Sequence, residues 1–244
     1  MNKGFASEHR WDRNAFLGLV VLAWVGLVMG FGPQIQHHVA KQGFSYPAIL
    51  HIHAFLFVGW MILLTAQVLL IRFHRLPIHR KLGFVMAGWA VAMVIIGPVT
   101  AWYMDRLEFG TPDGDASFQI VQYSDILIFG TLTAAAILCR RWSSAHKRLM
   151  LLGTLHITDA GFARWLGGPL FHVLGSSLPA TIAEMYGPPD LLMLGLGAYD
   201  LITRKRLHPA YIVGLPWVFA VQISAAWLYA YPAWKSLAAH LLGH

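Results

Sequence analysis

Apolar residues dominate seven stretches of the chain, and polar residues gather in the short segments between them. Each stretch approaches or exceeds the roughly 17–25 helical residues that cross the hydrocarbon core of a bilayer. The pattern therefore predicts an all-α integral membrane protein, a seven-helix bundle that forms one transmembrane domain over residues 1–244. The predicted helices cover residues 15–31, 48–71, 84–103, 123–139, 149–166, 189–203 and 210–231.

Two of these predicted helices differ from an ordinary membrane span. The run at 189–203 is short for a membrane span, but the preceding SLPATIAEMYGPP is mildly apolar and is expected to extend it. The extension crosses Pro188–Pro189, where a kink is one outcome because proline cannot donate a backbone hydrogen bond. The run at 15–31 also fits a signal peptide, yet no small-x-small cleavage site follows GLVMGFGPQ, so we interpret it as a helix.

Composition and charge agree with a membrane protein. Hydrophobic residues make up 57% of the chain and charged residues 12%, with a net charge of +7. Nucleic-acid binding is not predicted, because the basic residues lie in short clusters between apolar runs. Fourteen of them lie in the segments 3–13, 72–81, 140–148 and 204–206.

Seven helices place all four basic segments on one side of the membrane, whereas the other side receives only Lys41, Arg106 and Lys235. Lys and Arg accumulate in the short loops that lie on the cytoplasmic side of the membrane. The N-terminus is therefore predicted to be cytoplasmic and the C-terminus outside, in a bacterial-type inner membrane.

The basic turns also resemble one another. HRLPIHRKLG, RWSSAHKRLM and RKRLHPAYIVG each end one helix and place a histidine, His79, His146 or His208, just before the next. They predict three similar helical hairpins plus one additional helix, produced either by duplication or by convergent charge bias. The first helix carries Gly26-x-x-x-Gly30, a spacing typical of close helix packing.

Ionisable side chains inside a span are candidate functional residues, because burying them in hydrocarbon is costly. The fifth span, LMLLGTLHITDAGFARWL, carries His156, Asp159 and Arg164. The first two are three residues apart and should share one helix face. Arg164 is five residues beyond Asp159, so its partner is expected on another helix.

Counting about 1.5 Å per residue from Leu149 puts Asp159 at ~15 Å and Arg164 at ~22 Å, in the outer half of the bilayer. Other polar residues begin neighbouring helices on that side. We therefore predict an outward-facing pocket with Asp159 as its floor and His156 below it, at ~10 Å. The pocket is expected to contain Asp159, Arg164, Asp125 and Asp190, with His51 and His53 at its mouth.

The same residues also fit ordinary structural roles. His51 and His53, in AILHIHAFLFVGW, lie about 200° apart around a helix, so at least one is expected at the lipid headgroups. His156 and Asp159 could serve only as interhelical hydrogen-bonding groups.

Several activities are excluded by the sequence. A retinal Schiff base requires a lysine that the seventh span does not have. Cys139 is the only cysteine, so there is neither an intrachain disulfide nor a Cys-x-x-Cys motif. Serine-hydrolase, zinc-protease, Walker A and c-type haem motifs are also missing. The sequence does not decide whether the protein is an enzyme.

The segments HRKLG, HKRLM and YDLITRKRLHPAYIVG resemble a broad group of uncharacterised bacterial multi-pass inner-membrane proteins. More distantly, histidines on antiparallel helices resemble membrane cytochromes b and haem-handling proteins. That resemblance implies haem b or a transition metal bound by His53 with His156, with His51 and His172 as further haem ligands and Asp159 as a further metal ligand. The chain departs from the pattern because His53 and His156 lie at different predicted depths.

Two hypotheses follow. In the first, the pocket binds haem or a metal in a redox protein. In the second, the chain is a small-solute or lipid-binding transporter, or an accessory subunit of a membrane complex, without catalysis. The expected partners are the lipid bilayer and either a membrane complex or a second copy of the chain.

Overall fold

The computed structural model covers residues 8–111 and 114–242 in detail, and this part of the chain is helical without any strand. The long helices follow the order predicted from the apolar runs. They are α1 (Asp12–Gln42), α2 (Ala48–Arg72), α3 (Leu76–Glu108), α4 (Gln119–Leu138), α5 (Ser143–His156), α8 (Leu178–Arg204) and α9 (Pro209–Ala230). Shorter elements are η1 (Ala116–Phe118), α6 (Asp159–Phe162), η2 (Ala163–Gly167), α7 (Gly168–Leu174) and α10 (Pro232–Leu241).

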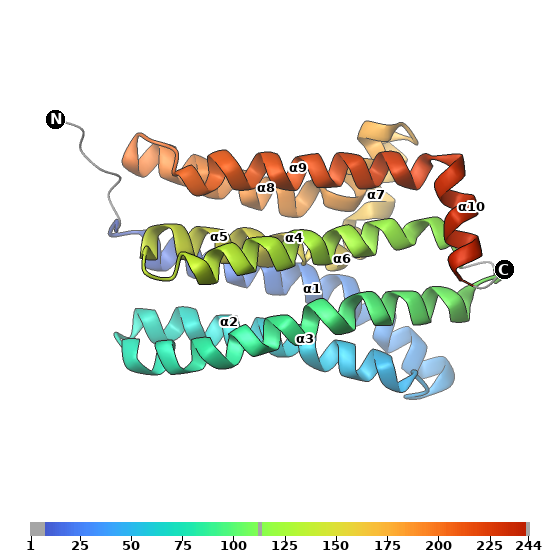
Figure 1. The fold of residues 1–244 in the computed structure, drawn as a ribbon, viewed down its shortest axis with the longest axis horizontal. Coiled ribbons are helices and arrows are strands. Elements are labelled where there is room, and N and C mark those ends of the chain that lie inside the picture. The colour runs from blue at the N-terminus through green and yellow to red at the C-terminus, as the bar shows by residue number, and fades with distance from the viewer. Residues whose placement is uncertain (1–7, 112–113, 243–244) are drawn as a thin grey trace.

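The long helices lie alongside one another, and their basic turns share one end of the molecule (Figure 1). The turns between α2 and α3, α4 and α5, and α8 and α9 all lie at the end where α1 begins, and α10 lies at the opposite end (Figure 1). We call these the inner and outer ends. Of the predicted N-terminal basic cluster, Lys3 lies outside the described residues.

Five stretches in the described part of the chain are long and apolar enough to cross a membrane: α1, α2, α3, Ala116–Leu138 and α9. Large apolar side chains also face outward on these helices; Phe84 and Leu138 are 76% and 79% exposed. A soluble protein rarely exposes such extensive apolar surface. The chain is thus an all-α, multi-pass membrane protein.

Several of the observed helices, such as α1 and α3, are longer than the apolar runs that predicted them. The run 15–31 lies within α1 and the run 84–103 within α3, which has 33 residues. Hydropathy marks only the part of a helix that lies in hydrocarbon, whereas backbone hydrogen bonds continue into the polar ends.

The prediction of a single fifth helix over 149–166 is wrong. Helix α5 begins earlier, at Ser143, and ends at His156; a turn at Ile157–Thr158 separates it from α6, the π-helix η2 and α7. At the turn, the Thr158 hydroxyl donates a 2.6 Å hydrogen bond to the Leu155 carbonyl. Such local side-chain bonds compete with helix continuation.

The predicted extension of the sixth helix is confirmed. Helix α8 continues without interruption from Leu178 to Arg204, through Pro188 and Pro189. Ser177 caps its start, because its hydroxyl accepts a 3.4 Å hydrogen bond from the Ala180 amide. The cap satisfies one of the donors that every helix start leaves unpaired.

Close packing of α1 against α6 depends on small residues. Gly26 packs against the ring of Phe162, and Gly30 packs against the backbone of Gly161; a Cβ at either glycine would overlap these atoms. The packing predicted from the Gly-x-x-x-Gly spacing is confirmed, and it holds α6 at the centre of the molecule.

Candidate functional site

The centre of the bundle contains a cluster of three side chains that can act as metal ligands. They are Asp125 on α4, His156 at the end of α5 and Asp159 at the start of α6. One ligand atom from each lies within 4.8 Å of the others. His156 is 0% exposed and Asp159 is 3% exposed. We call these three residues the central triad.

The α4–α5 hairpin explains why Asp125 and His156 face each other. Asp125 precedes the end of α4 at Leu138 by as many positions as His156 follows the start of α5 at Ser143. Both are therefore about 20 Å from the turn that joins the helices. His156 was predicted to lie below the pocket, but its ligand atom lies within 4.8 Å of those of Asp125 and Asp159. The count from Leu149 placed His156 too low relative to Asp125, because α5 begins at Ser143.

Asp159 lies three residues beyond His156, just after the turn at Ile157–Thr158. Residues three apart lie on one side of a helical segment, and the ligand atoms of the two side chains lie within 4.8 Å of each other. The Asp159 carboxylate accepts a 2.6 Å hydrogen bond from the Ala160 amide. That amide belongs to the first turn of α6, where backbone N–H groups are left free.

A second hairpin supplies two further polar groups. Gln222 on α9 donates a 2.9 Å hydrogen bond to the Asp190 carboxylate on α8. The same amide nitrogen lies 3.4 Å from His156 Nδ1. Asp190 precedes the end of α8 by nearly as many positions as Gln222 follows the start of α9, so they too lie at one level.

Two atoms of the triad face each other without forming a hydrogen bond. His156 Nε2 lies 3.4 Å from Asp125 Oδ1, but both atoms are buried without a hydrogen-bond partner among the described residues. Buried polar atoms are normally satisfied, because leaving one unpaired costs about 1–3 kcal/mol. The space between them is therefore suited to a cation or a proton.

The remaining predicted ligands lie elsewhere. His53 is on α2, where its ring stacks on Phe57 at 4.0 Å and its buried Nδ1 has no hydrogen-bond partner within the described chain. His51 is exposed, with its Nδ1 3.2 Å from the Pro47 carbonyl oxygen. His172 lies exposed on α7. The central triad includes none of these three histidines.

Arg164 lies in the π-helix η2 and bonds to α1. Its Nε donates a 3.0 Å hydrogen bond to the Gln34 side-chain oxygen, and its guanidinium lies 4.6 Å from the centre of the Phe31 ring. The partner is on another helix, as predicted, but it is an amide rather than one of the proposed carboxylates.

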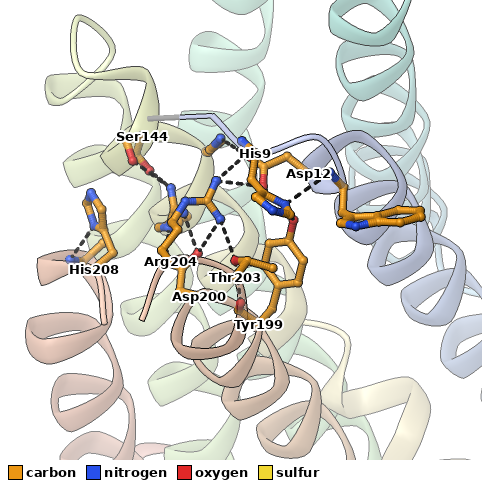
Figure 2. Close-up of polar contacts among 12 residues, drawn as sticks. His9, Asp12, Ser144, Tyr199, Asp200, Thr203, Arg204 and His208 are labelled. Carbon is orange, nitrogen blue, oxygen red and sulfur yellow. Dashed lines mark hydrogen bonds and ion pairs between the residues drawn. The ribbon is translucent and has the colours of Figure 1, made fainter. Parts of the chain in front are cut away.

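A second polar cluster, at the inner end, was largely missed by sequence reasoning (Figure 2). Its core is a buried ion pair between Arg148 on α5 and Asp200 on α8, both with fully buried side chains. Arg148 donates to both carboxylate oxygens, at 2.6 and 2.7 Å. Arg204, one turn further along α8, also donates a 3.1 Å hydrogen bond to Asp200.

Helix α1 joins this cluster through Asp12. Arg204 donates to both Asp12 oxygens at 2.7 and 2.8 Å, and Lys147 lies 2.7 Å from one of them. The Tyr199 hydroxyl donates a further 2.8 Å bond to Asp12. We call Asp12, Lys147, Arg148, Asp200 and Arg204 the inner ion network; it ties the inner ends of α1, α5 and α8 together.

Comparisons of the chain with protein-family models, curated proteins and solved structures find no match. The resemblance noted in the basic turns accordingly stays a prediction, and the function has to be argued from the geometry.

Proposed function

We propose that the chain is a seven-span protein of a bacterial-type inner membrane whose interior binds one divalent transition-metal ion. Asp125, His156 and Asp159 are its ligands. The interrupted stretch from α5 to α7 and the helix α8 act as the fifth and sixth spans. The basic inner end faces the cytoplasm, because Lys and Arg concentrate in the turns there.

The unpartnered pair of Asp125 Oδ1 and His156 Nε2 is the observation that carries the proposal. Imidazole nitrogen and carboxylate oxygen bind Zn²⁺ at about 2.0–2.2 Å, so two ligand atoms on one tetrahedral ion lie about 3.4 Å apart. His156 Nε2 and Asp125 Oδ1 have that spacing, at 3.4 Å, whereas the full set, within 4.8 Å, would have to contract around the ion. A bound cation also compensates two neighbouring carboxylates that are otherwise costly to bury together.

The Gln222 amide lies beside the triad. A metal-binding histidine normally donates its second ring N–H to an acceptor, which orients the ring. Gln222 Nε2 donates to Asp190 and lies 3.4 Å from His156 Nδ1; to accept the Nδ1 proton of a metal-bound His156, the amide would turn its oxygen, which is unpaired within the described chain, towards the ring. A transition metal at this site would supply redox or Lewis-acid chemistry, and the Asp–His–Asp set would fix its position.

The geometry favours a metal ion over haem b. Haem binding would need free space in front of the ligating imidazole nitrogen for the porphyrin, but a carboxylate oxygen lies 3.4 Å from His156 Nε2. The other candidate ligands, His53 and His172, have different neighbours, Phe57 and Phe171.

The rival proposal is that the triad only joins helices, in a transporter or an accessory subunit. Metal analysis of purified protein separates the two. We expect the wild type, purified in mild detergent without chelator, to contain close to one equivalent of a transition metal. We expect His156→Ala and Asp125→Asn to lose it, because each removes one ligand. Gln222→Leu should weaken binding about 10–100-fold, as loss of an orienting partner does at known metal sites.

His172→Ala is the matched control, because it removes an exposed histidine outside the triad. All variants should elute as a single species in size-exclusion chromatography, so that loss of metal is not loss of fold. Oxidised and reduced absorption spectra of the same samples detect haem. A wild type that binds no added Zn²⁺ or Mn²⁺, or a His156→Ala protein that binds as the wild type does, would overturn the proposal in favour of a packing role.

A further inference from the structure

An apolar groove of about 610 Å³ lies at the inner end, where α2 turns into α3. Its lining residues are Ala66, Leu69, Leu70, Phe73 and Arg75. Four of them are apolar and the fifth is a cation. Phe73 is 65% exposed, so the groove opens on the outer surface of the bundle.

The turn itself fixes Arg75 beside the groove. Helix α2 ends at Arg72, and His74 adopts a left-handed conformation with φ of 58°. The chain then folds back, so that the Arg75 amide donates a 2.7 Å hydrogen bond to the Leu70 carbonyl and the Phe73 amide bonds to Leu69 at 2.8 Å. This is a Schellman-type helix end, and it places a cation next to the apolar residues of the last turn.

The Arg75 guanidinium has no hydrogen bond or ion pair to any residue in the described part of the chain. The neighbouring Arg72, in contrast, donates a 2.8 Å bond to the Asn14 side-chain oxygen on α1. Arg80 and Lys81 are exposed near the start of α3 and add to the positive charge of this end. An apolar groove beside an unpaired cation at the membrane surface matches the two halves of an anionic phospholipid.

We propose that this groove is a binding site for an anionic phospholipid of the inner leaflet. One acyl chain lies along Leu69, Leu70 and Phe73, and the phosphate bonds to Arg75. Burial of apolar surface stabilises the bound acyl chain, while charge attraction selects anionic over zwitterionic headgroups. The site is separate from the central triad, so it stands or falls independently of metal binding.

Native mass spectrometry of the delipidated protein, titrated with phosphatidylglycerol or phosphatidylcholine, tests the proposal. We expect the wild type to bind phosphatidylglycerol more tightly. Arg75→Gln should weaken that binding about fivefold, the effect of one basic residue at an anionic membrane surface. Arg80→Gln is the matched control; it removes an exposed cation near the start of α3, outside the groove, and should change binding less than twofold.

Leu70→Trp tests whether the groove binds the acyl chain, because a larger side chain fills the groove without altering its charge. The substitution should weaken the binding of both lipids and leave the preference for phosphatidylglycerol intact. Equal losses in Arg75→Gln and Arg80→Gln would indicate a diffuse basic surface and overturn the site. Displacement of the lipid by inorganic phosphate, with no effect of Leu70→Trp, would show that a free anion is bound instead.

Discussion

A buried histidine caps the last long helix. His208 precedes α9, and its Nδ1 accepts a 3.0 Å hydrogen bond from the Ala210 amide. An imidazole nitrogen can accept this bond only when it carries no proton. Burial, with the positive charge of Arg148 nearby, lowers the pKa of His208 from 6.5 to about 4. His208 is thus a neutral cap of α9.

This pKa predicts a pH-dependent stability. The unfolded chain takes up the proton near pH 6.5 and the folded chain near pH 4, so the contribution of His208 is complete above pH 6.5 and falls as the pH drops towards 4. His208→Asn keeps a capping side chain but cannot titrate. Between pH 7.5 and 5 we expect the apparent Tm in detergent to fall further in wild type than in His208→Asn.

Comparison of the two proteins at each pH cancels the titration of other groups. Equal losses of Tm in wild type and variant would show that the cap of α9 does not depend on the charge of His208.

The residues of the triad could be predicted from the sequence, but their full grouping could not. His156, Asp159, Asp125 and Asp190 were identified from the cost of burying ionisable groups in spans. Their grouping was missed in part, because depth was counted from the ends of apolar runs. Counting from the shared turn would have put Asp125 and His156 level, since the two residues are equally far along the chain from their ends of that turn.

At the scale of elements, hydropathy predicted the long helices well because each must bury its backbone polar groups in hydrocarbon. It failed at Ile157–Thr158, where the residues stay apolar or weakly polar while the backbone changes course. The Thr158 hydroxyl bonds to the Leu155 carbonyl at the break, a local interaction that hydropathy does not detect. The break matters because Asp159 begins the short helix that follows it.

The close packing of α6 against α1 predicts how an added methyl group at Gly30 changes stability. Gly30→Ala should lower stability, because the new Cβ overlaps the Gly161 backbone and overpacking costs about 1–3 kcal/mol. Gly32→Ala is the control: it lies in the same helix with nothing within 4 Å of its Cβ, and a gain of up to about 1 kcal/mol is expected from helix propensity. Thermal unfolding in detergent measures both.

If Gly30→Ala were as stable as Gly32→Ala, α1 and α6 would not be packed as closely as described. A destabilised Gly30→Ala with a normal metal content would instead show that the triad does not need the contact.

For the molecule as a whole, the inner ion network connects helices that are distant in sequence. Asp12 and Arg204 lie 192 residues apart, yet they share two hydrogen bonds. No periodicity in the sequence predicts such a contact, because each residue alone fits the ordinary basic or acidic end of a span. The network is where α1, which belongs to none of the three hairpins, joins the bundle at its inner end.

Its central pair gives the last prediction. Asp200→Asn should destabilise the protein by about 3–5 kcal/mol, because it leaves the buried Arg148 charge without its bidentate partner. Adding Arg148→Met to Asp200→Asn should recover part of this loss, since removing both charges also removes their desolvation cost. The exposed Arg141→Gln is the control in the adjacent turn and should change stability by less than about 0.5 kcal/mol. Additive losses in the double variant would mean that the two side chains contribute separately; recovery would show that the helices are joined through this pair.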